Sequence, residues 1–367
     1  MELFSAHDHR FMAQALQLAR NGLFTTTPNP RVGCVIVQGD KVVGEGWHLR
    51  AGEPHAEVHA LNAAGALAKG ATAYVTLEPC SHHGRTPPCA DALIAAGVTR
   101  VVAAMQDPNP QVSGQGIAEL RAAGIDVSVG LMEAEARELN IGFVSRMERG
   151  KPWVRLKVAI SLDGKTALNN GVSQWITGPD ARRDAHQWRA RSCAMLTGIG
   201  TVREDDPRLT VRDVDPSDEN PRQPLRVVVD SKLEIPLDAK ILEGGNALVA
   251  CAVEDRAKSE ALKKLGAEVV VLANSAGKVD LPVLLHELAR RGINEVMVES
   301  GPKLNGSLLR EGCVDELLIY QAPILLGESA RGMFNLPELT DLSVKRELNI
   351  IDRRVVGSDT RLTARFR

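Results

Sequence analysis

Short runs of β-branched residues alternate with alanine-rich stretches along most of this chain. In the first half, strands are predicted at 32–37, 41–47, 73–77, 100–104 and 126–129, and helices at 56–68, 89–96, 116–123 and 133–140. The Gln38-Gly39-Asp40 turn predicts a hairpin between the first two strands. Strands that alternate with helices of this length favour an α/β fold whose sheet is largely parallel and covered on both faces.

The second half continues the same alternation. Strands are predicted at 153–159, 194–197, 225–229, 247–250, 268–271, 295–298 and 316–320, and helices at 179–191, 256–265, 282–290 and 303–310. Charge, a glycine and a proline in Glu148-Arg149-Gly150-Lys151-Pro152 indicate a linker between the halves. A chain of 367 residues is long enough for two cores. We therefore expect two α/β domains, 1–148 and 149–367.

Charge and cysteine content narrow the possible partners and location. Lys plus Arg number 44 against 46 for Asp plus Glu, and this balance argues against a nucleic-acid partner. Residues 1–10 lack the basic and apolar pattern of a signal peptide, and the apolar run 317–327 is shorter than a bilayer span, so no membrane partner is expected. The six cysteines show no disulfide-framework spacing, which predicts a cytoplasmic protein.

Four residues of the first half suggest a metal centre. His55, Cys80 and Cys89 supply one imidazole and two thiolates, a ligand set suited to Zn²⁺ that leaves the fourth tetrahedral position for water. Zinc can lower the pKa of that water to roughly 7, and Glu57, two residues after the histidine, can take its proton. Pro54 before His55 and Pro88 before Cys89 predict that these ligand segments lie at helix N-termini.

The order of these residues resembles the zinc-deaminase signature, with one departure. Eight residues separate Cys80 from Cys89, where the general pattern has two. In the alternative interpretation, His55 and the cysteines are core residues and Glu57 is a surface helix residue. A purely structural zinc site is a further alternative, and it would require a fourth protein ligand.

The second half has no such decisive motif. It lacks G-x-G-x-x-G and a Walker loop, and it offers two glycine-marked turns, at 196–201 and 298–307. The second turn would let a phosphate approach the free N–H groups of a helix start, although such turns are also ordinary strand-to-helix connections. Most of its arginines can be interpreted as solvated surface charges as well as phosphate ligands. Trp175 and Leu209 can be interpreted as core residues.

Motifs in both halves resemble the bifunctional riboflavin-biosynthesis enzymes, in which a pyrimidine deaminase is fused to a uracil reductase. The resemblance runs nearly the whole length of the chain. The motifs that carry it are 27–33 (TPNPRVG), 52–57 (GEPHAE), 78–89 (EPCSHHGRTPPC), 157–165 (KVAISLDGK), 173–177 (SQWIT), 205–212 (DDPRLTVR) and 299–302 (ESGP).

The resemblance implies a cytidine-deaminase-like α/β/α domain followed by a dihydrofolate-reductase-like α/β domain. It implies that His55, Cys80 and Cys89 bind zinc and that Glu57 is the general acid/base. The implied contacts to NADPH are Ala159, Trp175, Thr201, Asp205, Ser231, Gly301, Pro302, Lys303, Leu304, Asn305, Gly306 and Ser307. The implied contacts to substrate are Asn29, His48, His82 and Arg85 in the deaminase and Ser173, Arg189, Leu209, Arg212 and Glu299 in the reductase.

The expected substrate is a small molecule, a pyrimidine ribosylamine phosphate, which is deaminated and then reduced by NADPH. Lys157, Asp163, Asp205 and a bound water all remain candidate proton donors for the reduction. A nucleic-acid base deaminase is the rival function, and the charge balance argues against it. We expect a homo-oligomer, but its size, any transfer of product between the sites and the preference for NADPH over NADH do not follow from the sequence.

Overall fold

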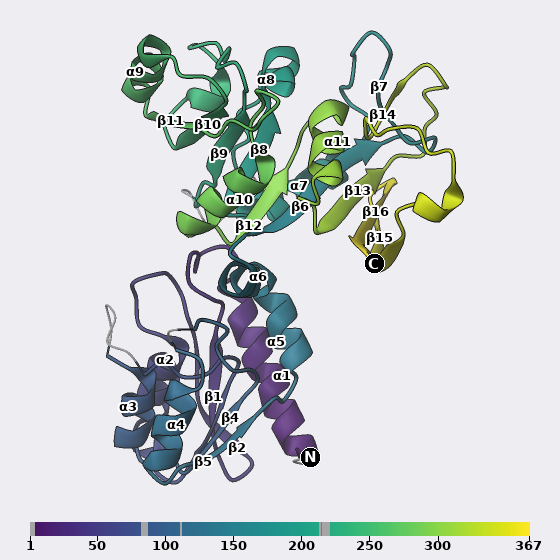
Figure 1. The fold of residues 1–367 in the computed structure, drawn as a ribbon. Helices are drawn as coiled ribbons and strands as arrows, with labels where there is room; N and C mark the ends of the chain where they lie inside the picture. Colours follow the sequence, from purple (N-terminus) through teal and green to yellow (C-terminus); the bar gives the residue numbers. More distant parts are fainter. Residues whose placement is uncertain (1–3, 82–86, 111, 213, 215–220) are drawn as a thin grey trace. The chain divides into compact units, whose positions relative to one another are not determined.

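The chain forms two compact units, Met1–Gly150 (unit 1) and Lys151–Arg367 (unit 2) (Figure 1). The computed structural model describes residues 4–81, 87–110, 112–212, 214 and 221–367. Helix α6 (Ile141–Arg149) ends at the break, and its C-cap Gly150 takes a left-handed φ of 65°. Glu148 and Arg149 are therefore helical, and the linker expected to include them is shorter.

Unit 1 is built on a mixed sheet with the strand order β2-β1-β3-β4-β5. Its strands are β1 (Gly33–Gln38), β2 (Lys41–Trp47), β3 (Thr72–Val75), β4 (Arg100–Ala103) and β5 (Asp126–Val129). The predicted hairpin is confirmed, because β1 pairs antiparallel with β2. Strand β1 is also antiparallel to β3, whereas β3, β4 and β5 are parallel. The sheet is thus less parallel than expected.

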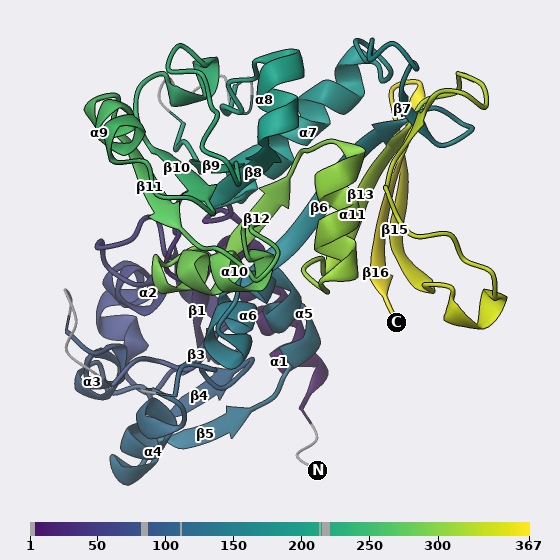
Figure 2. The same cartoon turned by 45° about the horizontal axis from the view of Figure 1, so that its top comes forward.

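Helices cover both faces of this sheet (Figure 2). They are α1 (Ala6–Arg20), α2 (Ala56–Ala64), α3 (Cys89–Ala95), α4 (Gln115–Ala122), α5 (Glu133–Leu139) and α6. Side chains of α2, α3 and α4 form one core cluster with the sheet, and those of α1, α5 and α6 contribute to the other. The face under α2, α3 and α4 is the one from which the predicted zinc ligands come.

Two glycines of β2 set how closely α2 approaches the sheet. A Cβ atom on Gly44 would lie 2.1 Å from the carbonyl oxygen of Ala60, and one on Gly46 would lie 2.4 Å from that of Ala56. Any larger residue would force the helix away from the strand. Because Ala56 is the first residue of α2, this contact also fixes the position of His55 just before it.

Helix α1, which the sequence analysis does not predict, is anchored by one carboxylate. Asp8 closes a capping box with Ser5, and its Oδ1 accepts hydrogen bonds from Tyr74 of β3 (2.8 Å) and Arg100 of β4 (2.7 Å). Burial alone would raise the pKa of Asp8, but the hydrogen bonds from Arg100, Ser5 and Tyr74 outweigh it and hold the pKa well below its usual range.

Unit 2 has a sheet with the strand order β11-β10-β9-β8-β12-β6-β13-β16-β15. All its pairs are parallel except β13 with β16 and β16 with β15. The strands are β6 (Trp153–Ile160), β8 (Ala194–Gly198), β9 (Leu225–Val229), β10 (Ala247–Cys251), β11 (Ala267–Val271), β12 (Glu295–Val298), β13 (Glu316–Gln321), β15 (Leu348–Val356) and β16 (Asp359–Phe366). Strands β7 (Lys165–Ala167) and β14 (Arg331–Gly332) form a separate small sheet.

Helices cover both faces of this second sheet as well. They are α7 (Pro179–Arg191), α8 (Ile199–Asp205), α9 (Arg256–Lys264), α10 (Leu281–Arg290) and α11 (Pro302–Arg310). Side chains of α10 and α11 pack into one core cluster, and those of α7, α8 and α9 pack into the other. Strands β15 and β16, helix α8 and the small sheet were not predicted.

Replacing Asp8 by Asn tests this anchor of α1. We expect the variant to lower the free energy of opening α1 by about 1.5–3 kcal/mol at pH 7, as for hydrogen bonds to charged groups. Because the pKa of Asp8 is depressed in the folded state, its contribution is complete above the unfolded pKa of about 3.9 and is lost as pH falls further. The difference in opening free energy between variant and wild type should therefore begin to shrink below about pH 4 and go on shrinking as pH falls.

Hydrogen exchange of the α1 amides, compared at each pH in the full chain, measures that difference. Asp126→Asn is the matched control, because Asp126 is an exposed carboxylate 3.7 Å from the same Arg100. Its effect should stay below about 0.5 kcal/mol. A difference for Asp8→Asn that is independent of pH contradicts the assigned role of its charge.

Candidate metal centre and cofactor pocket

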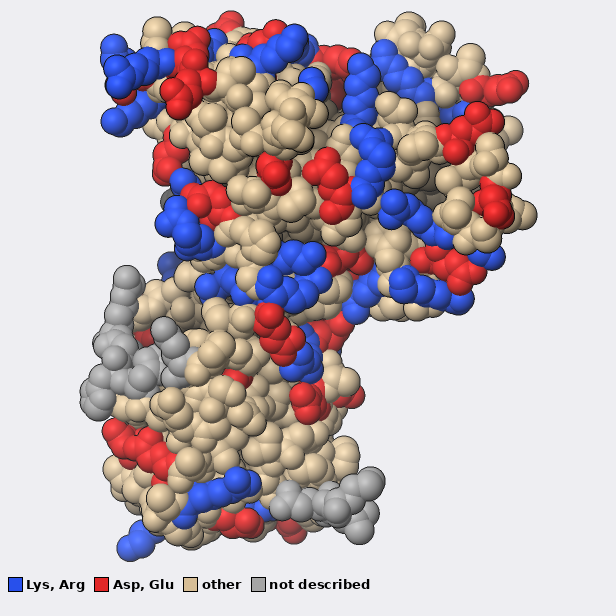
Figure 3. All heavy atoms as spheres, viewed as in Figure 1, with Lys and Arg blue, Asp and Glu red and all other residues tan. Residues whose placement is uncertain are grey.

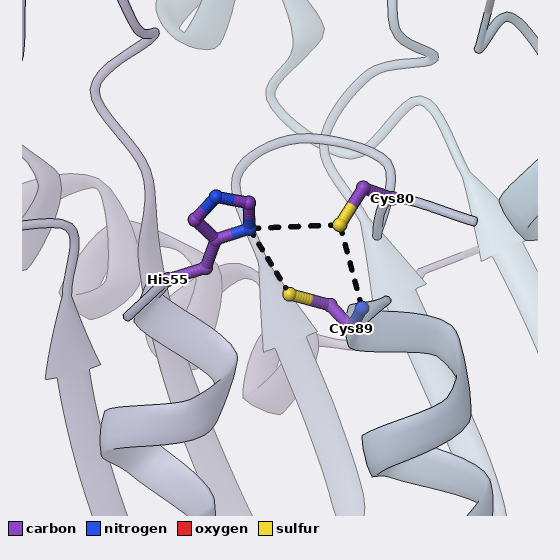
Figure 4. A group of neighbouring side chains, drawn as sticks. All are labelled: His55, Cys80 and Cys89. Carbon is purple, nitrogen blue, oxygen red and sulfur yellow. Dashed lines mark hydrogen bonds between the residues drawn. The ribbon is translucent and has the colours of Figure 1, made fainter. Parts of the chain in front are cut away.

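Three side chains of unit 1 point toward one another at the start of two helices (Figure 4). His55 is the N-cap of α2, Cys89 is the first residue of α3, and Cys80 lies in the segment after β3. The His55 Nδ1 atom is 3.3 Å from Cys89 Sγ and 3.5 Å from Cys80 Sγ. All three donor atoms lie within 4.8 Å of one another.

These separations fit a single zinc ion. With bonds of about 2.3 Å to sulfur and 2.0–2.1 Å to nitrogen, neighbouring ligands of tetrahedral zinc lie about 3.5–3.8 Å apart. Hydrogen bonds from Cys89 and His55 outweigh burial and hold the pKa of Cys80 well below its usual range, which favours the thiolate that a metal needs. Among the residues that the structure describes, the group has three protein ligands, which leaves a tetrahedral position open.

Glu57 lies beside this group in the first turn of α2, and only 3% of it is exposed. Burial, with a smaller effect of the Cys80 charge, raises the pKa of Glu57 to about 7. A carboxyl group with a pKa near neutrality can both accept and return a proton under physiological conditions. The structure thus rejects the interpretation of Glu57 as a surface residue.

Asn29 and His48 form a hydrogen-bonded pair next to the metal group. His48 Nδ1 is 3.2 Å from the Pro54 carbonyl oxygen, which can only accept, so this nitrogen carries the proton. Burial lowers the pKa of His48, which favours the neutral ring. Its Nε2 then accepts from the Asn29 amide nitrogen at 3.1 Å, and the Asn29 oxygen remains free of this bond. His82 and Arg85, the other two expected contacts, lie outside the described residues.

Unit 2 contains a cavity of about 410 Å³ near the carboxyl ends of β6, β8 and β12. Ligand sites of open α/β sheets form at this edge. The cavity collects eleven of the residues expected to bind cofactor or substrate: Ala159, Ser173, Trp175, Arg189, Thr201, Asp205, Leu209, Arg212, Glu299, Gly301 and Pro302.

Six expected cofactor contacts are not among the residues that line this cavity: Ser231, Lys303, Leu304, Asn305, Gly306 and Ser307. The Ser231 hydroxyl accepts a hydrogen bond from the Val279 amide. The Asn305 side chain is buried and bonds to Ser300 and to the Met333 carbonyl oxygen. Asn335 lies against Gly306, because a Cβ atom on Gly306 would be 2.1 Å from the Asn335 carbonyl oxygen. In this conformation Asn305 and Gly306 hold α11 in place.

A partly buried ion pair lies in the wall of the cavity. Arg189 donates to both carboxylate oxygens of Glu299, at 2.6 and 3.0 Å, and Lys157 Nζ lies 3.6 Å from the same group. Burial alone would raise the pKa of Glu299, but the charges of Arg189 and Lys157 lower it to about 2. Glu299 is therefore a fixed carboxylate, and Arg189 is largely committed to it.

The structure separates the two residues that also fitted a core. Trp175 is 69% exposed and stacks against the guanidinium of Arg182, 4.4 Å from the ring centroid, so the core interpretation is wrong for it. Leu209 is buried in a core cluster and also lines the cavity.

The cavity also includes Glu204 and Arg331, which form an ion pair at 3.2 Å and were not expected. Their separation of 127 residues explains why sequence reasoning missed them.

Comparison with known proteins identifies the family. Residues 152–361 match the family described as RibD C-terminal domain, and residues 5–105 match the cytidine and deoxycytidylate deaminase zinc-binding region. The chain is 53% identical over 362 residues to the riboflavin biosynthesis protein RibD of Escherichia coli (strain K12), covering 96% of this chain and 97% of that protein. The chain belongs to the RibD family. It is a deaminase and a reductase of riboflavin biosynthesis, with zinc and NADPH as cofactors.

Solved structures of relatives agree with this assignment. Acinetobacter baumannii RibD, form 1, superposes with a TM-score of 0.93 at 46% identity, covering 98% of this chain and 99% of that one. A diaminohydroxyphosphoribosylaminopyrimidine deaminase/5-amino-6-(5-phosphoribosylamino)uracil reductase from Thermotoga maritima superposes with a TM-score of 0.85 at 33% identity, with the same coverage. The resemblance and the α/β fold class expected for both domains are confirmed. Within the described residues, no helix is long and apolar enough to cross a membrane.

Proposed function

We propose that unit 1 hydrolyses the 2-amino group of 2,5-diamino-6-(5-phosphoribosylamino)pyrimidin-4(3H)-one and that unit 2 reduces the ribosyl group of the resulting uracil to ribityl. The observation that carries this proposal is the convergence of His55, Cys80 and Cys89 beside the buried Glu57. The same two reactions are named for the Thermotoga maritima relative. The boundary between the units follows Gly150, two residues after the boundary expected from the sequence.

In the deaminase, the three ligands hold the ion while Glu57 moves protons. Zinc, when bound, supplies a Lewis acid that makes water nucleophilic at neutral pH. Glu57 would accept one proton of the attacking water and pass it to the pyrimidine ring nitrogen. It would then take the second proton, from the hydroxyl group now on C2, and give it to the amino group, which leaves as ammonia while the C2 carbonyl forms. The Asn29 oxygen, which His48 leaves free, faces the N–H groups of the substrate. We further propose that His82 and Arg85 contact the substrate.

In the reductase, the cavity of unit 2 would hold both nicotinamide and substrate. NADPH supplies the hydride for C1 of the opened ribose. We assign Ala159, Trp175, Thr201, Asp205 and the turn at Gly301 to the cofactor, together with Ser231 and the remaining residues up to Ser307. Contact with Ser231 and with residues 303–307 requires the cofactor to extend beyond the cavity, along the edge of the sheet.

In unit 2, a carboxylate and a guanidinium would bind different parts of the substrate. Ser173, Leu209 and Glu299 would position the pyrimidine, with the Glu299 carboxylate accepting from its N–H edge. Arg189 and Arg212 are the two cations among the implied substrate contacts, and both are candidates to hold the phosphate. Because Arg189 is bound to Glu299, we assign the phosphate mainly to Arg212, whose guanidinium forms no ion pair with another described residue. Arg189 then keeps Glu299 charged and oriented.

The charge of the surface also favours a small-molecule substrate over a nucleic acid. On the face that Figure 3 shows, both Lys and Arg and Asp and Glu are present on each unit. The two signs of charge also balance over the sequence, whereas nucleic-acid binders carry an excess of Lys and Arg. The six cysteines are all free, which supports the cytoplasmic location that we propose.

Glu57→Gln tests the proton carrier. The variant should keep its zinc while kcat for ammonia release falls about 10²–10⁴-fold, since the amide cannot accept the proton of water. Reduction of the uracil intermediate by NADPH should not change. Glu53→Gln, an exposed glutamate of the preceding loop, is the matched control with normal deamination. Wild-type ammonia release by Glu57→Gln would falsify the role.

Arg212→Ala tests the phosphate assignment. Loss of a charge-assisted hydrogen bond to phosphate should raise KM for the phosphorylated uracil intermediate about tenfold or more. KM for NADPH, and for the substrate without its phosphate, should stay the same. Arg203→Ala is the control, because Arg203 pairs with Glu234. If KM rises equally for the substrate with and without phosphate, Arg212 does not bind that group.

We also propose a homo-oligomer formed through β15, the edge strand of the unit 2 sheet. Ile350, Ile351 and Val355 are 64%, 50% and 80% exposed there, and apolar edge strands tend to pair with another strand. Antiparallel pairing of two copies through β15 would cover these apolar side chains and the unpaired backbone groups of the edge.

Sedimentation velocity tests this interface. Val355→Lys should shift the wild-type oligomer toward monomer, because the lysine would be buried against an apolar side chain. Val253→Lys, at an exposed valine away from β15, should leave the mass unchanged. A monomeric wild type, or a Val355→Lys variant that stays assembled, rules out this interface.

A further inference from the structure

Glu78 is a buried carboxylate for which the proposed chemistry has no use. It lies two residues before the ligand Cys80 and is 3% exposed. Each of its carboxylate oxygens accepts two backbone N–H groups. The donors are Asp107 and Gly114 to Oε2, both at 3.0 Å, and Gly116 (3.0 Å) and Ile117 (3.2 Å) to Oε1. One side chain thus joins the segment after β3 to the loop after β4 and to the first turn of α4.

An independent contact between backbones presses α4 against the same segment. Gly116, in the first turn of α4, lies so close to Pro79 that a Cβ atom would be 1.9 Å from the Pro79 carbonyl oxygen. No side chain fits in that space. Pro79 is the residue between Glu78 and Cys80, so α4 holds the chain directly before the ligand.

The chain is also held on the other side of the ligand. The Cys80 carbonyl oxygen accepts from the Ala90 amide at 3.1 Å, and its sulfur accepts from the Cys89 amide at 3.4 Å. Cys80 therefore lies between two fixed points, the start of α3 and the contacts that Glu78 and Pro79 make with α4. Its sulfur has little freedom to move relative to His55.

We propose that Glu78 is a positioning residue that sets the Cys80 sulfur in ligand geometry before a metal binds. This inference rests on the zinc ligands named under the proposed function. A carboxylate suits the role because it offers two acceptor oxygens to two pairs of donors. Glutamine has the same shape but only one acceptor oxygen, and its NH₂ group would face two of the N–H groups that donate to the carboxylate. That repulsion would displace the chain that leads to Cys80.

Zinc release from the full-length, zinc-loaded protein into a colorimetric chelator tests the proposal. Glu78→Gln should release zinc about 10–100-fold faster than wild type, the range found when groups that orient metal ligands are lost. The Co²⁺-substituted variant should show a weaker thiolate-to-cobalt absorption band. Gly116→Ala, which displaces Pro79 through the backbone, should give both effects. Glu133→Gln, an exposed glutamate of α5, is the matched control and should behave as wild type.

Hydrogen exchange of the α1 and sheet amides of unit 1 in the same samples reports whether unit 1 of each variant is folded. If Glu78→Gln loses that protection, Glu78→Asp takes its place, since it keeps both acceptor oxygens and should release zinc at an intermediate rate. Wild-type zinc release and an unchanged cobalt spectrum in the folded variant, even with a lower melting temperature, would overturn the proposal. A wild-type protein that binds no stoichiometric zinc would instead refute the proposed metal site.

Discussion

The packing of α2 and α3 against the sheet of unit 1 is the constraint on which the deaminase depends. Gly44 and Gly46 let α2 lie against β2, and this contact fixes His55 at the start of the helix. The segment after β3 brings Cys80 to the same edge of the sheet, where Cys89 begins α3. Three donor atoms from distant parts of the sequence are thereby held at ligand distance, and a disordered chain could not hold them there without a large entropy cost.

Each site contains a glutamate whose pKa is shifted by its neighbours, upward in unit 1 and downward in unit 2. Glu57 has too few favourable partners to offset its burial, so its pKa rises to about 7 and it can exchange protons. Glu299 is partly buried at the wall of the cavity, but Arg189 and Lys157 lower its pKa to about 2, so it stays charged. In the proposed mechanism the same residue type would serve proton transfer in one unit and substrate recognition in the other, because its neighbours differ.

Most elements that a local pattern determines were predicted, one of them was missed, and roles that depend on contacts between distant residues were not predicted. The hairpin, most strands and the start of α3 at Cys89 follow from turns, periodicity and proline placement. Helix α1 was missed although Ser5 and Asp8 form a capping box before apolar residues at helical spacing, a signal that was present. The role of Glu78 was not predictable, because its four donors lie 29 to 39 residues further along the chain.

X-ray absorption at the zinc edge of the purified protein tests the central claim most directly. If His55, Cys80 and Cys89 hold the ion with one position open, the spectrum should fit two sulfur atoms at about 2.3 Å and an imidazole nitrogen at about 2.0–2.1 Å. One further light atom should complete the shell. A shell with three or more sulfur atoms, or with none, would contradict the account.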